Sequence, residues 1–139
     1  MKLLFVCTGN TCRSPMAEAL ARNWLDKTGR DDIIVESAGI FASGGSVTSA
    51  AAEAMAELGV DIRGRRSRQL TKAICNQADY IAVMTPAHAA LLQSQFDVPQ
   101  EKIRLLGRGI PDPFGGDGTL YRQTRDVLQQ AVTALLESF

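Results

Sequence analysis

A buried strand that passes directly into a loop and then into a helix restricts the fold of this chain most strongly. Residues 3–6 are a continuous apolar run, which is typical of a strand covered on both faces. After the loop, apolar residues recur every four positions, at Met16, Leu20 and Trp24. This spacing predicts a helix over residues 15–27 whose apolar side faces the sheet. Together the two elements indicate an α/β fold.

The rest of the sequence continues this alternation. Further strands are predicted at 32–37, 78–84 and 102–106, and further helices at 48–58, 71–76, 86–96 and 120–139. Alternating strands and helices form a parallel sheet with helices on both faces, joined by right-handed crossovers. We expect a three-layer αβα fold with a four-stranded parallel sheet in the flavodoxin-like order 2-1-3-4. One domain is expected to span residues 1–139.

Composition restricts the class of protein. Fifteen basic and fifteen acidic side chains leave no net charge, so composition gives no reason to expect binding to nucleic acid or to a membrane. No apolar run is long enough for a signal peptide or a membrane span. Three cysteines without framework spacing fit a reducing compartment. We therefore expect a cytoplasmic protein, and a monomer.

The loop after the first strand has the features of an anion site. A helix N-terminus presents unpaired N–H groups and the positive end of the helix dipole, so phosphate binds there readily. Gly9 and Asn10 tolerate the positive φ that turns loop amides inward. Arg13 carries a planar guanidinium that matches two phosphoryl oxygens. The expected phosphate-binding residues are Thr8, Gly9, Asn10, Thr11, Cys12, Arg13 and Ser14.

Cys7, at the end of the first strand, is the candidate nucleophile. The thiolate is the reactive form, and a helix N-terminus beside a guanidinium favours it. The Ser14 hydroxyl is placed to donate to the sulfur and favour the thiolate further. A lone cysteine at this position would more simply be a buried core residue. Its combination with Arg13 and Ser14 between a strand and a helix favours catalysis.

The pattern Cys-x5-Arg-Ser-Pro at residues 7–15 resembles the phosphate-binding loop of the low-molecular-weight protein tyrosine phosphatases. The similarity covers essentially the whole chain and includes Ser37-Ala38-Gly39 and Asp112-Pro113-Phe114. The resemblance implies an enzyme that removes phosphate from phosphorylated proteins through a phosphocysteine intermediate. It implies no metal and no other cofactor.

Some residues resemble the protein arginine phosphatase branch of this family, namely Thr8, Thr11 and the stretches 41–43, 112–116 and 121–126. Tyrosine-directed relatives tend to carry a large aliphatic residue at the position of Thr11, which suits an aromatic ring. Threonine is smaller and offers a hydroxyl, which suits a guanidino group. Phosphoarginine is therefore the first expectation and phosphotyrosine the alternative, since threonine could equally serve loop packing.

A long loop after the fourth strand is expected to supply a general acid. Loops that follow parallel strands share one edge of the sheet. Six residues from Leu106 to Asp112 can span about 20 Å, and the first strand lies about 10 Å away. Asp112 can therefore reach the pocket and protonate the leaving group. An Asp-Pro pair alone is more often a turn, and Asp117 is the weaker candidate acid.

The resemblance also implies supporting residues. Ser37 would bond to the loop around Asn10, and Phe41 and Phe114 would determine specificity at the substrate entrance. From sequence alone, Phe41 is equally well explained as a hydrophobic residue packed under a loop.

Other residues have simpler interpretations. His88, the only histidine, is expected to be surface or core filler, because one histidine cannot build a metal site. The basic run at residues 63–68 is expected to be a solvated face, with docking of an acidic or phosphorylated partner as the alternative. Cys75 is expected to be a structural thiol.

Cys12 is a candidate for redox chemistry. It could form a reversible disulfide with Cys7 that shields or inactivates the nucleophile. An arsenate reductase on the same scaffold would need relay cysteines, and residues 84–96 contain none, so Cys12 is the only plausible relay. A phosphate-sensing module without catalysis is a further alternative, in which Cys7 would be dispensable.

Overall fold

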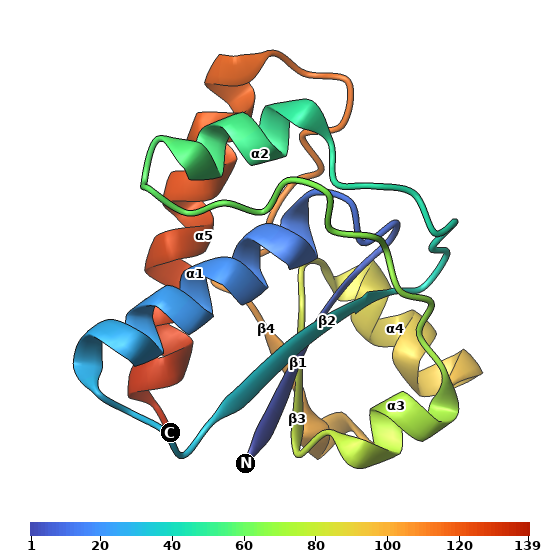
Figure 1. The fold of residues 1–139 in the computed structure, drawn as a ribbon. Coiled ribbons are helices and arrows are strands. Elements are labelled where there is room, and N and C mark those ends of the chain that lie inside the picture. The colour runs from blue at the N-terminus through green and yellow to red at the C-terminus, as the bar shows by residue number, and fades with distance from the viewer.

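The computed structural model describes residues 1–139 and has three layers, with a sheet between two layers of helices (Figure 1). Four parallel strands pair in the order β2-β1-β3-β4. They are β1 (Lys2–Cys7), β2 (Ile34–Gly39), β3 (Tyr80–Val83) and β4 (Ile103–Leu105). The predicted fold class and strand order are confirmed.

Helices cover both faces of the sheet (Figure 1). On one side lie α1 (Arg13–Thr28), α2 (Ser49–Ala56) and α5 (Gly118–Glu137). On the other lie α3 (Lys72–Gln77) and α4 (Pro86–Gln95), and the short helix η1 (Gln100–Lys102) precedes β4. No helix combines the length and apolar character that crossing a bilayer requires.

The side chains of β1 enter two hydrophobic cores. Leu3, Phe5 and Cys7 belong to the core shared with α1, α2 and α5, whereas Leu4 and Val6 belong to the core shared with α3 and α4. Because side chains of a strand alternate between faces, burial on both faces requires a continuous apolar run. This explains the sequence of β1.

Hydrogen bonds in the first turn move the predicted starts of two helices. α1 begins two residues before its predicted start, because the Met16 N–H already donates to the Cys12 carbonyl over 3.1 Å. α5 begins two residues before its predicted start, because the Asp117 side chain caps it by accepting from the Leu120 N–H over 3.0 Å. Asp117, the weaker candidate acid, therefore has a structural role.

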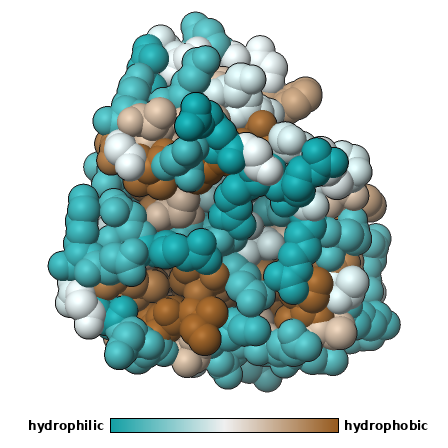
Figure 2. All heavy atoms as spheres, viewed as in Figure 1, coloured by the Kyte–Doolittle hydropathy of each residue, from teal (hydrophilic) through white to brown (hydrophobic).

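The carboxyl ends of β1, β2 and β4 continue into the loops 8–12, 40–48 and 106–117. The face drawn in Figure 2 is hydrophilic over most of its area, with hydrophobic residues gathered low in the view. The functional candidates lie in the loops at the carboxyl edge, because parallel strands bring these loops together.

Candidate active site

The loop between β1 and α1 curls around the sulfur of Cys7. Asn10 adopts a φ of 55°, and its N–H donates to Cys7 Sγ over 3.3 Å. Four other loop N–H groups have no acceptor within the protein, those of Thr8, Gly9, Thr11 and Cys12. A row of free amides at a helix N-terminus is suited to hold a phosphate group.

A directed chain of hydrogen bonds ends on this sulfur. Ser37 Oγ donates to the Glu18 carboxylate over 2.7 Å and accepts from Asn10 Nδ2 over 3.0 Å. Asn10 Nδ2 also donates to Ser14 Oγ over 2.6 Å. The Ser14 hydroxyl thus accepts from Asn10 and keeps its own proton for Cys7 Sγ, 2.9 Å away. Two donors, one backbone and one hydroxyl, stabilise negative charge on the sulfur.

The backbone of β2 approaches the loop closely. A Cβ atom at Gly39 would lie 2.8 Å from the Thr8 carbonyl oxygen and 2.9 Å from the Asn10 nitrogen, too near for any side chain. Ser37, two residues earlier, bonds to Asn10 as the resemblance implied. Ser37-Ala38-Gly39 therefore supports the shape of the phosphate loop.

A buried carboxylate that the sequence analysis missed begins the chain of hydrogen bonds. Glu18, on α1, is 2% exposed. It receives two N–H bonds from Arg65, at 2.7 and 2.8 Å, and pairs with Arg22 at 3.0 Å. A buried charge needs such partners. The prediction of a solvated face at residues 63–68 is therefore wrong for Arg65, which turns inward because Glu18 requires a cation.

Arg13 lies buried beneath the loop. Its Nη1 donates to the Ile110 carbonyl over 2.8 Å, and its Nη2 lies 3.7 Å from Asp112 Oδ2. Its Nε is buried and has no acceptor in the protein. This N–H is a donor that remains for a phosphoryl oxygen, while the bond to Ile110 holds the loop after β4 against the phosphate loop.

Asp112 reaches the phosphate loop, as the chain-length estimate predicted. Its Oδ1 accepts from the Phe114 N–H over 3.0 Å and lies 3.7 Å from Cys12 Sγ. Its side chain is 49% exposed. The carboxyl group therefore lies at the mouth of the site, where it contacts both the buried loop and water.

The two remaining thiols differ in their surroundings. Burial, together with the nearby charges of Cys7 and Asp112, raises the pKa of Cys12 to about 12. Cys12 is therefore a protonated thiol at neutral pH and donates toward Asp112. Cys75 is buried in the core beneath α3 and α4, where burial raises its pKa, as expected for a structural thiol.

His88 contacts the phosphate loop, so the prediction of surface or core filler is wrong. Its Nε2 lies 2.8 Å from Thr8 Oγ1, and no hydrogen bond joins it to Cys7. Burial lowers the pKa of His88 to about 4, helped by the positive charge of Arg13, so the imidazole is neutral at pH 7. Its position in the first turn of the helix after β3, at the carboxyl edge of the sheet, is the sequence feature that could have indicated a role.

The three expected specificity residues differ in how exposed they are. Thr11 is half-buried within it, and its carbonyl accepts from the Thr48 N–H over 2.9 Å. Phe41 donates its N–H to the Thr8 carbonyl over 2.8 Å. Phe41 and Phe114 are 64% and 73% exposed, so Phe41 is not packed under a loop. Both aromatic rings are available to a substrate.

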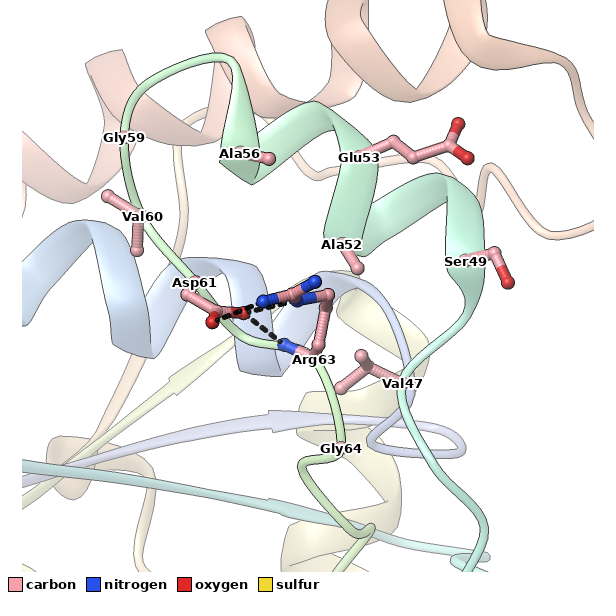
Figure 3. Close-up of a pocket in the computed structure, with 10 residues that line it drawn as sticks. All are labelled: Val47, Ser49, Ala52, Glu53, Ala56, Gly59, Val60, Asp61, Arg63 and Gly64. Carbon is pink, nitrogen blue, oxygen red and sulfur yellow. Dashed lines mark hydrogen bonds and ion pairs between the residues drawn. The ribbon is translucent and has the colours of Figure 1, made fainter.

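A cavity of about 730 Å³ lies beside α2, against the segment 59–64 (Figure 3). Asp61 and Arg63 form an ion pair at 3.0 Å on its wall. None of its lining residues belongs to the phosphate loop or to the loop that carries Asp112. This cavity is therefore separate from the Cys7 site.

Known proteins are similar to this chain in sequence and in fold. The family model described as low molecular weight phosphotyrosine protein phosphatase matches residues 2–139. A protein-arginine-phosphatase of Bacillus subtilis (strain 168) is 39% identical over 97% of this chain and 94% of its own length. The low molecular weight protein-tyrosine-phosphatase PtpB of Staphylococcus aureus is 34% identical over 97% and 96%. A solved structure of a YwlE arginine phosphatase mutant with a phosphorylated active-site serine has a TM-score of 0.93 at 38% identity, over 99% and 95% of the two chains.

Proposed function

Because this chain belongs to the low molecular weight phosphotyrosine protein phosphatase family, we propose that it hydrolyses phosphoarginine in proteins through the Cys7 thiolate. The observation that carries the proposal is the set of groups around Cys7 Sγ. Two donors stabilise the sulfur, four amides of the loop that follows it have no acceptor in the protein, and Arg13 keeps an unbonded buried N–H. This arrangement suits a nucleophile and the phosphoryl group that it attacks.

The mechanism follows from these groups. Arg13 and the loop amides bind the phosphoryl oxygens and stabilise the charge that spreads over them in the transition state. The Cys7 sulfur forms a bond to phosphorus while the P–N bond breaks, and the electron pair of that bond goes to the guanidino nitrogen. Asp112 gives this nitrogen a proton. Water then attacks the phosphocysteine with Asp112 as base, and phosphate leaves as Cys7 becomes a thiolate again.

Substrate choice is proposed to depend on Thr11. A relative is named a protein-arginine-phosphatase, and we expect this chain to hydrolyse a phosphoarginine protein faster than a phosphotyrosine peptide. In a Thr11→Ile variant, we expect phosphoarginine turnover to fall by about tenfold and phosphotyrosine turnover to rise, because the larger apolar side chain removes a hydroxyl and suits an aromatic ring. Measurement of kcat/KM for both substrates checks this.

A Thr11→Ser variant is the matched control, because it keeps the hydroxyl and removes only a methyl group. It should keep the preference for phosphoarginine. An unchanged ratio of the two kcat/KM values in Thr11→Ile would remove the reason for choosing phosphoarginine over phosphotyrosine.

We also propose that peroxide inactivates the enzyme reversibly through a disulfide between Cys7 and Cys12. Peroxide would oxidise the Cys7 sulfur to a sulfenic acid and be reduced to water. The Cys12 sulfur would then bond to the Cys7 sulfur, and the Cys12 proton would pass by way of Asp112 to the sulfenic hydroxyl, which leaves as a second water. The support is that Cys7 and Cys12 flank one short loop and lie close enough for the charge of Cys7 to raise the pKa of Cys12.

Peroxide treatment followed by dithiothreitol tests this redox proposal. Wild type should regain activity, whereas Cys12→Ser should stay inactive because unprotected Cys7 oxidises further. Cys75→Ser is the control and should behave like wild type. Equal recovery of activity by wild type and Cys12→Ser would show that Cys12 does not protect Cys7 from further oxidation.

We further propose that the enzyme works as a monomer in the cytoplasm. Its three cysteines are all unpaired, which suits a reducing compartment. Sedimentation at a mass well above 15.0 kDa would contradict the monomer.

A further inference from the structure

We infer that His88 is a positioning residue of the active site, which fixes the Thr8 side chain beside the nucleophile and leaves the Thr8 hydroxyl proton free for the substrate. The inference rests on the proposed phosphatase function. It concerns a hydrogen bond between residues 80 positions apart, whose length is 2.8 Å.

Thr8 is held from two directions. It directly follows Cys7, and its carbonyl accepts from the Phe41 N–H over 2.8 Å. Its Oγ1 contacts Nε2 of His88 from the opposite layer of helices. His88 is itself fixed, since it is 5% exposed and its N–H donates to Thr85 Oγ1, the N-cap of α4, over 3.2 Å. A rigid helix end thus sets the orientation of the Thr8 hydroxyl.

The surroundings of the other ring nitrogen, Nδ1, determine which group donates in the hydrogen bond between His88 and Thr8. Nδ1 of His88 is buried and has no partner. A proton on Nδ1 would leave a buried donor unbonded, which costs more than leaving a lone pair unused. The neutral imidazole therefore carries its proton on Nε2 and donates it to Thr8 Oγ1.

The Thr8 hydroxyl consequently keeps its own proton. No protein atom other than the His88 nitrogen lies in hydrogen-bond contact with Oγ1, and Thr8 is exposed on the loop. His88 lies near enough to Arg13 and Asp112 for both charges to act on the imidazole. A fixed O–H donor on this side of the loop is suited to a phosphoryl oxygen that gains charge in the transition state.

Four variants test the inference: His88→Leu, His88→Gln, Thr8→Val and the double variant His88→Leu with Thr8→Val. Leucine has a similar size and no donor, whereas the glutamine amide places an N–H close to the position of Nε2. We expect His88→Leu to lower kcat on a phosphoarginine protein by about tenfold with little change in KM, since the lost contact is made in the transition state. His88→Gln should recover most of this loss, and His88→Leu should add little in the Thr8→Val background.

Additive losses in the double variant would overturn the inference, as would an unchanged kcat in His88→Leu. Thermal unfolding of each variant separates misfolding from lost positioning, and Thr8→Val tests the hydroxyl even if His88→Leu does not fold, because Thr8 is exposed. An inactive wild type would refute the proposed function instead, and the two failures are thus distinct.

Discussion

A Cys7→Ser variant should release phosphate at least about 10⁴-fold more slowly than wild type. A serine hydroxyl is protonated at neutral pH, so it is a weaker nucleophile than a thiolate, and it is a poorer leaving group when water attacks. The substitution removes no other contact of the loop. Phosphate release from a phosphoarginine protein, measured with excess substrate, gives the rate.

Phosphate binding should survive this substitution, because the free amides and Arg13 remain. Calorimetry with inorganic phosphate should give a dissociation constant close to that of wild type. Mass spectrometry adds a second test. A similar protein has been solved with a phosphorylated active-site serine, so we expect mass spectrometry of Cys7→Ser after exposure to substrate to detect a phosphoryl group on residue 7.

The control for this experiment is Cys75→Ser, which changes a thiol in the other core and should leave turnover unchanged. Undiminished phosphate release by Cys7→Ser would exclude the proposed nucleophile. Phosphate binding by a wild type that releases none from any phosphorylated substrate would favour the sensing module. Arsenate-dependent oxidation of Cys7 and Cys12 would favour the reductase.

The fold was predictable because its determinants are local in sequence. The continuous apolar run of β1 and the four-residue spacing in α1 identify each element from neighbouring residues. Topological rules for parallel strands then leave few arrangements. The phosphate loop was predictable for the same reason, since Cys7, Asn10 and Ser14 lie within eight consecutive residues whose contacts follow from one turn and one helix start.

The supporting contacts were not predictable in this way. Glu18 meets Arg65 across 47 positions, and Thr8 meets His88 across 80. Such pairs depend on how helices and loops pack, and a single sequence does not record that packing. Glu18 looks like an ordinary helix residue paired with Arg22 four positions later. Only its burial shows that a second cation is needed.

Asp112 is intermediate between these cases. Chain length and strand order placed it within reach, but they did not distinguish it from Asp117, five residues later. The distinction is structural. Asp112 lies against Arg13 and Cys12, whereas the Asp117 carboxylate caps the first turn of α5.

An Asp112→Asn variant should lower kcat on a phosphoarginine protein by about 10²- to 10⁴-fold, the usual contribution of a general acid. Asparagine has the size of aspartate and can still accept from the Phe114 N–H, but it has no acidic proton. The loss should therefore depend on the leaving group. p-Nitrophenyl phosphate releases a stable phenolate that needs no proton, so formation of the phosphocysteine from it should slow much less.

Burst and steady-state kinetics with both substrates separate this step from hydrolysis of the phosphocysteine. Asp117→Asn is the matched control, because asparagine caps a helix as well as aspartate does. The turnover of this variant should stay within about twofold of wild type. An equal loss in the first step for both leaving groups would mean that Asp112 positions the loop through Arg13 and does not donate the proton. In that case the acid must be sought among the other groups at the mouth of the site.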